Sequence, residues 1–108
     1  MASFQIDTRK ITDWKSFHDV FEIELKFFEG YGRNMDAWID CMTDLHSEHS
    51  LSGHHLPVGD PVVFEFQYTE DFIKRCPEIF LNLIECTAFV NQRYESFSDG
   101  EYVLFKFI

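Results

Sequence analysis

Residues 30–45 are GYGRNMDAWIDCMTDL, and they predict a loop with two glycines that leads into a short amphipathic helix. Successive residues of an α-helix are about 100° apart, so Asp36, Asp40 and Asp44 fall within about 80° of one another. The opposite arc is apolar and carries Met35, Trp38, Ile39, Cys41, Met42 and Leu45. We therefore expect one face of this helix to be anchored and the other to present carboxylates.

The acidic face differs from an ordinary solvated helix face, which generally mixes charges of both signs. It carries three aspartates and no lysine, and its only nearby cation in the sequence is Arg33. Like charges at i,i+4 destabilise a helix by a few tenths of a kcal/mol, so stability alone does not explain the pattern. We interpret the face as a docking surface for a cationic partner, and the alternative is a plain solvated face.

The composition limits the class of protein. A chain of 108 residues with 45% hydrophobic and 18% aromatic content predicts one globular domain. Its net charge of −10 argues against nucleic acid or an anionic membrane as a direct partner and favours a basic protein, although charge can also serve solubility. Three cysteines and the absence of an apolar leader in residues 1–10 predict a reduced, cytoplasmic protein.

Apolar patterns predict three strands, near residues 4–6, 62–66 and 102–108. The second is expected to be buried, and the third is an almost unbroken apolar run. Helical segments separate the strands along the chain. This order indicates right-handed crossovers and a parallel sheet, which is an α/β fold.

The helices carry recognisable start signals. Thr12 or Asp13 is a candidate N-cap for a helix beginning near Trp14, Thr69 is a candidate N-cap for a short helix, and Pro77 fits the first position of the last helix. The side chains expected to face the core from the first and last helices are Trp14, Phe17, Val20, Phe21 and Leu25, and Phe80, Leu83, Ile84, Thr87 and Val90.

Residues 46–61 are rich in Ser, Gly, His and Pro and predict a long exposed loop. His46, His49 and His54 have a spacing that zinc could use, but no cysteine joins them, so we expect a polar loop and no metal or cofactor. The sequence has no GxSxG, CxxC or Gly-rich phosphate motif, and carboxylates on a convex helix face stay ionised. We therefore expect no enzymatic activity.

Two short motifs resemble a known family. They are Tyr31-Gly32-Arg33-Asn34-Met35-Asp36-Ala37 and Asp40-Cys41-Met42-Thr43. Their residue types and spacing resemble the core motif of the barstar family, which comprises intracellular inhibitors of the ribonuclease barnase. The resemblance implies one barstar-like α/β domain over residues 1–108, with a three-stranded parallel sheet packed by about four helices. It also implies that residues 46–61 are an insertion relative to the family pattern.

The resemblance further implies that an acidic plug mimics substrate phosphate and blocks a basic, extracellular-type ribonuclease. Asp40 would pair with the enzyme's arginines and catalytic histidine, and Asp36 with a second cation. Glu95, near the end of the last helix, is a looser candidate, because the family uses an acidic residue from that region. The expected partner-binding residues are Tyr31, Gly32, Asn34, Asp36, Ile39, Asp40, Thr43 and Asp44.

Three positions depart from the family pattern, because Gly30, Ile39 and Leu45 replace aromatic residues. Aromatic side chains usually dominate interface energies, and Tyr31 and Trp38, each one position away, are candidates to compensate. The identity of the cognate enzyme therefore stays open. The alternatives are an immunity or antitoxin protein that binds a different basic toxin, and a metal-dependent enzyme built on the histidine loop.

We expect residues 46–61 to be dispensable for folding and for binding. Changing the length of a flexible loop alters its closure entropy slowly, by roughly 0.6 kcal/mol per doubling. A short Gly/Ser replacement should melt within a few degrees of the parent in a thermal scan by circular dichroism and should still bind the partner. A trimmed protein that folds without binding would make this loop a second contact surface.

Overall fold

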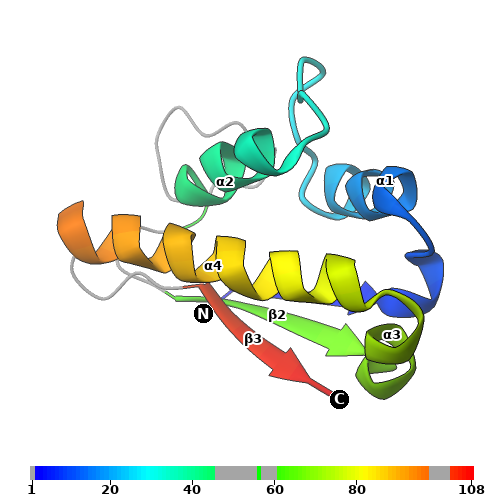
Figure 1. Ribbon diagram of the computed structural model, residues 1–108. Coiled ribbons are helices and arrows are strands. Elements are labelled where there is room, and N and C mark those ends of the chain that lie inside the picture. Colours follow the sequence, from blue (N-terminus) through cyan, green and yellow to red (C-terminus); the bar gives the residue numbers. More distant parts are fainter. Residues whose placement is uncertain (1, 46–55, 57–60, 98–102) are drawn as a thin grey trace.

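The computed structural model describes residues 2–45, 56, 61–97 and 103–108 (Figure 1). In chain order, its elements are β1 (Ala2–Asp7), the 3-10 helix η1 (Thr8–Lys10), α1 (Trp14–Glu24), α2 (Met35–Thr43), β2 (Val62–Gln67), α3 (Thr69–Arg75), α4 (Pro77–Phe97) and β3 (Val103–Phe107).

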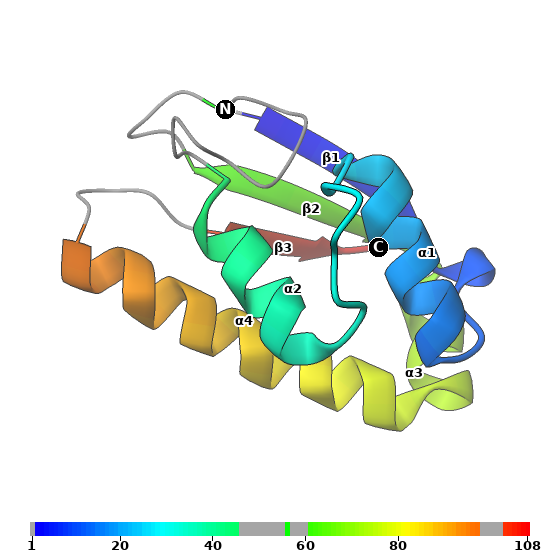
Figure 2. The same ribbon diagram turned by 90° about the horizontal axis from the view of Figure 1, so that it is seen from above.

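The strands form one parallel sheet in the order β1-β2-β3. The predicted α/β fold, with three parallel strands and four α-helices, is confirmed. Along the central strand, Val62, Phe64 and Phe66 are buried, whereas Val63 and Glu65 are only half-buried. The alternation arises because α1, α2 and α4 all lie over the same face of the sheet (Figure 1 and Figure 2). The second strand is therefore buried on one face and not on both.

The core under these helices is built around Phe21 of α1. Its ring centroid lies 4.8 Å from that of Phe17, 5.6 Å from Trp38, 6.1 Å from Phe64 and 6.4 Å from Phe66. One buried ring thus joins α1 and α2 to the central strand of the sheet. The position of α2 over the sheet depends on this aromatic cluster.

Two of the three predicted helix starts are confirmed. Asp13 caps α1 through a capping box, and Pro77 is the first residue of α4. The prediction for Thr69 is wrong by one residue, because Tyr68 occupies the N-cap in a left-handed conformation with φ 58°. Thr69 is the first helical residue, and its hydroxyl donates a hydrogen bond to the carbonyl oxygen of Phe66 at 2.8 Å.

The predicted inner faces of α1 and α4 are largely confirmed, with one error in α4. Trp14 and Phe80 are half-buried, whereas Ile84 is 37% exposed and was wrongly expected in the core. The buried residues of α4 recur every three or four positions and form a narrow stripe, and Ile84 lies about 100° from Leu83 around the helix. The stripe consists of Ile79, Leu83, Thr87, Val90 and Tyr94.

Most of the predicted loop insertion lies outside the described residues, including the zinc candidates His46, His49 and His54. Within that segment the structure describes Leu56 and Pro61. Leu56 is partly buried and packs against the core. A loop replacement that also removes Leu56 is therefore expected to cost more stability than closure entropy alone.

The central role of Phe21 leads to a stability prediction. Truncating a large buried ring removes its transfer free energy and leaves a cavity, so Phe21→Ala should lower the free energy of unfolding by about 3–5 kcal/mol. The matched control is Ile23→Ala in the same helix, because Ile23 is 74% exposed and its loss should change stability by less than about 0.5 kcal/mol. Urea unfolding followed by circular dichroism measures both, and equal losses would contradict this account of the core.

Candidate partner-binding site

The apolar face of α2 holds this helix to the rest of the molecule. Trp38 and Met42 are fully buried, and Cys41 is 1% exposed. The Trp38 ring stands edge-on to Phe21, with the ring centroids 5.6 Å apart. From α4, the Tyr94 hydroxyl donates a hydrogen bond to the Met42 carbonyl oxygen at 2.5 Å, which satisfies an acceptor in the last turn of α2. The predicted apolar arc is thus confirmed.

Asn34 begins α2 as its N-cap. Its side-chain oxygen accepts a hydrogen bond from the backbone N–H of Ala37 at 2.8 Å. The carboxylate of Asp36 follows in the first turn, where it interacts favourably with the partial positive charge of the helix N-terminus. Asn34 therefore fixes where the helix starts, while its predicted contact with a partner stays a prediction.

The other face of α2 presents carboxylates to solvent. Asp36 is exposed, and so is 64% of the Asp40 side chain. Asp44 is half-buried and lies one residue beyond the helix, at its C-cap. The Thr43 hydroxyl is directed back into the helix and donates to the Ile39 carbonyl oxygen at 2.7 Å. The exposed acidic face of the helix, which we call the α2 acidic face, consists of Asp36 and Asp40.

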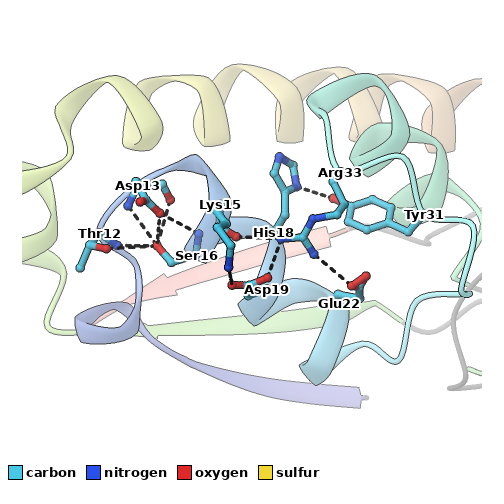
Figure 3. A network of polar contacts seen from close by, with 9 residues as sticks. All are labelled: Thr12, Asp13, Lys15, Ser16, His18, Asp19, Glu22, Tyr31 and Arg33. Atoms are coloured by element: carbon cyan, nitrogen blue, oxygen red, sulfur yellow. Dashed lines mark hydrogen bonds and ion pairs between the residues drawn. The ribbon is translucent and has the colours of Figure 1, made fainter.

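The loop before α2 is supported by a buried polar contact. The Tyr31 hydroxyl lies 2.6 Å from Nδ1 of His18 in α1, and both residues are buried (Figure 3). The Tyr31 ring also packs against Phe27, with ring centroids 4.8 Å apart. Burial raises the pKa of Tyr31, and burial together with the charge of Arg33 lowers the pKa of His18. In the free protein, Tyr31 therefore supports the loop from inside.

Arg33 ties the same loop to the surface of α1 (Figure 3). Its guanidinium donates to Asp19 at 2.5 Å, to Glu22 at 3.1 Å and to the Lys15 carbonyl oxygen at 3.1 Å. These bonds hold the Arg33 backbone at φ 55°, a left-handed conformation that is unusual for a residue other than glycine. The hydrogen bond from Arg33 also lowers the pKa of Asp19. The cation expected beside the acidic helix is therefore directed to α1 instead.

A different arginine reaches the α2 acidic face. Nη1 of Arg93, in α4, lies 3.1 Å from Oδ1 of Asp40, and its guanidinium lies 5.2 Å from the centre of the Phe89 ring. This pair could not be predicted from the sequence, because the two residues are 53 positions apart and no local pattern joins them. Only the packing of α4 beside α2, visible in Figure 2, brings them together.

The cysteine thiols reflect the negative charge around α2. Burial and the charge of Asp40 raise the pKa of the Cys41 thiol to about 11. Burial also raises the pKa of Cys86 in α4, with further contributions from Glu85 and Asp36. Asp36 of α2 therefore adds to the negative potential at a thiol of α4, the helix that packs beside α2.

The chain matches a known protein family. The family model described as Barstar (barnase inhibitor) matches residues 1–106 of the chain. This chain belongs to the barstar family. A search among curated proteins finds no match. The family consists of inhibitors of barnase-type ribonucleases rather than enzymes, and its α/β fold agrees with the sheet and helices described above.

The residues predicted from the barstar motif differ in accessibility. Tyr31 is 5% exposed and Trp38 is fully buried, so neither ring takes the place of the missing aromatic anchors at the surface. Phe89 of α4 is 50% exposed beside Arg93, and Glu95 is exposed further along the same helix. Of the other predicted contacts, Gly32, Asn34, Asp36 and Asp40 are exposed, and Ile39, Thr43 and Asp44 are half-buried.

Two other kinds of site are absent from the part of the chain that the structure describes. Its His, Cys, Asp and Glu side chains form no group of three or more that could hold a metal ion. None of its helices combines the length and apolar character needed to cross a membrane.

Because His18 is buried, we predict that the free energy of unfolding depends on pH. Its pKa is lowered in the folded protein, with Asp19 and Glu22 opposing the shift in part, so the unfolded chain binds a proton first as the pH falls. The contribution of His18 is present above its unfolded pKa of about 6.5 and is lost as the pH falls towards the folded value. The loss begins as the pH falls below about 6.5, and a single group cannot contribute more than about 1.4 kcal/mol per pH unit to the slope.

Urea unfolding at several pH values measures this slope. His18→Gln should remove the contribution of His18 while leaving the other histidines and the carboxylates to titrate as before. The comparison concerns the slope, so a uniform loss of stability in the variant does not affect it. Parallel curves for the parent and the variant would contradict the prediction.

Proposed function

We propose that this barstar-family protein inhibits a basic ribonuclease by placing α2 and the loop before it in the active site of the enzyme. The two-sided construction of α2 supports the proposal. Asp36 and Asp40 are exposed one turn apart, while Trp38 and Met42 on the opposite side are fully buried. A ribonuclease binds substrate phosphate with cationic side chains. Carboxylates on a helix held in one orientation can bind the same cations, and they offer the enzyme no phosphodiester bond to cleave.

The contacts that position α2 and its preceding loop favour tight binding. Asn34 caps the start of α2, Tyr94 bonds its last turn, and Arg33 ties the preceding loop to α1. A surface that is ordered before binding loses less conformational entropy when the complex forms. The carboxylates are therefore presented in one geometry and need little rearrangement to dock.

Charge chemistry suits the proposed partner. Arginine binds a carboxylate through two parallel charge-assisted hydrogen bonds, so Asp40 can take the place of a phosphate oxygen pair, and Asp36 can meet a second cation one turn away. The net charge of −10 steers a basic enzyme towards the inhibitor over distances limited by salt screening to about 10 Å at 0.1 M ionic strength.

A second candidate function follows from the aromatic positions. Gly30, Ile39 and Leu45 lack the rings of the family pattern, and the neighbouring Tyr31 and Trp38 are buried. An interface with fewer aromatic anchors fits a partner whose active site differs from that of barnase. The runner-up is therefore an immunity or antitoxin role against a different basic toxin, using the same α2 acidic face.

We predict that Asp40→Ala abolishes inhibition without unfolding the protein. Residues at the centre of an interface can cost 2 kcal/mol or more when truncated, which corresponds to a rise of at least roughly 30-fold in the inhibition constant. Inhibition of barnase, measured with a fluorogenic RNA substrate, tests the prediction. Circular dichroism should be unchanged, because 64% of the Asp40 side chain is exposed.

The matched control is Asp71→Ala. Asp71 is also an exposed aspartate paired with an arginine, Arg75 at 2.6 Å, but it lies in α3 beside the N-terminal end of α4, whereas α2 packs on the C-terminal half (Figure 1). This variant should inhibit as well as the parent. The proposed site would be refuted if the parent inhibits barnase and the Asp40→Ala variant inhibits it equally well. A parent that does not inhibit barnase but captures another basic toxin would favour the second candidate.

A further inference from the structure

The cation beside Asp40 belongs to the inhibitor itself. Nη1 of Arg93 lies 3.1 Å from Oδ1 of Asp40. In the proposed function, a cation of the enzyme takes this position beside Asp40. We propose that Arg93 is a specificity-determining residue, which competes with the partner's cations for Asp40 and must leave it before the complex forms. The inference rests on the proposed function and adds a selection step at the same site.

The geometry allows Arg93 to leave. The side chain of Arg93 is 40% exposed and that of Asp40 is 64% exposed, and ion pairs open to solvent contribute little to stability. The half-exposed Phe89 ring, 5.2 Å from the guanidinium, offers a second contact through its π-face. Arg93 can therefore release Asp40 and still rest on α4.

The competition affects partners unequally. An arriving arginine that shares Asp40 with Arg93 would lie within a few ångströms of another positive charge and be repelled. A single weakly held lysine on a generally basic protein would be disfavoured by this repulsion. An active site with several converging cations can displace Arg93, because each of them also attracts Asp40. Rejection of unsuitable partners by a built-in unfavourable contact is a common source of specificity.

The position of Arg93 differs from that of a similar arginine elsewhere in the chain. Arg9 pairs with Asp7 at 2.8 Å and lies 4.1 Å from the centre of the Tyr68 ring, so it has the same two kinds of contact. Its carboxylate partner, however, is two residues away and lies at the end of β1, outside the α2 acidic face. Arg9 is therefore a matched control that changes the net charge equally.

The experiment compares the parent with Arg93→Gln, Arg93→Lys and Arg9→Gln. Two probes are used: barnase, with inhibition and association rate as readouts, and a tetra-arginine peptide, whose binding at low ionic strength is followed through the amide NMR signals of Asp36 and Asp40. Arg93→Gln should bind both probes more tightly than the parent, by roughly three- to five-fold for the peptide, the size expected when a surface ion pair no longer competes. Barnase should gain less than the peptide, because the cations of an active site converge and already displace Arg93, whereas those of a flexible peptide do not. Arg9→Gln should stay within a factor of about two, and Arg93→Lys should fall between Arg93→Gln and the parent.

The outcomes separate this inference from the proposed function. If Arg93→Gln and Arg9→Gln improve binding equally, the effect is one of net charge and the inference is wrong. If Arg93→Gln weakens binding, Arg93 instead meets an acidic group of the partner, and the inference is wrong as well. If neither the parent nor any variant binds barnase, the proposed function fails for that enzyme. The peptide result alone then decides the role of Arg93.

Discussion

The contact between Trp38 and Phe21 is the interaction on which the rest of the site depends. Trp38 is the largest side chain of α2 and is fully buried, although no described residue accepts a hydrogen bond from its Nε1. Burial of so large an aromatic ring makes Trp38 the main anchor of this helix. Phe21 connects α2 to the sheet, because its ring packs against Trp38 and also against Phe64 and Phe66 of β2.

The same contact fixes the direction of the carboxylates. Each residue of a helix is rotated by about 100° from the one before it, so placing Trp38 and Met42 in the core leaves Asp36 and Asp40 facing away from it. Rotating α2 about its axis would expose a tryptophan and bury an unpaired carboxylate, and both changes are unfavourable. Burial of the apolar face of α2 therefore also determines which carboxylates are exposed.

Features set by neighbouring residues could be predicted from the sequence. The two arcs of α2, the Asp13 cap and the Pro77 start all follow from helical periodicity or from local hydrogen bonds. Features set by packing could not. The buried contact of the Tyr31 loop depends on His18 of α1, and the pair between Arg93 and Asp40 depends on how α4 lies beside α2.

The two arginines show why net charge alone does not describe this surface. Arg33 precedes the α2 acidic face in the sequence, but its bonds to Asp19 and Glu22 on α1 direct it away. Arg93 is distant in sequence and neutralises Asp40 directly. Neither set of ion pairs changes the total charge of the chain. The pairs nevertheless decide which carboxylates are unpaired when a partner approaches. A basic protein that approaches this surface is therefore distinguished less by how positive it is than by whether its cations converge closely enough to replace the one already bound to Asp40.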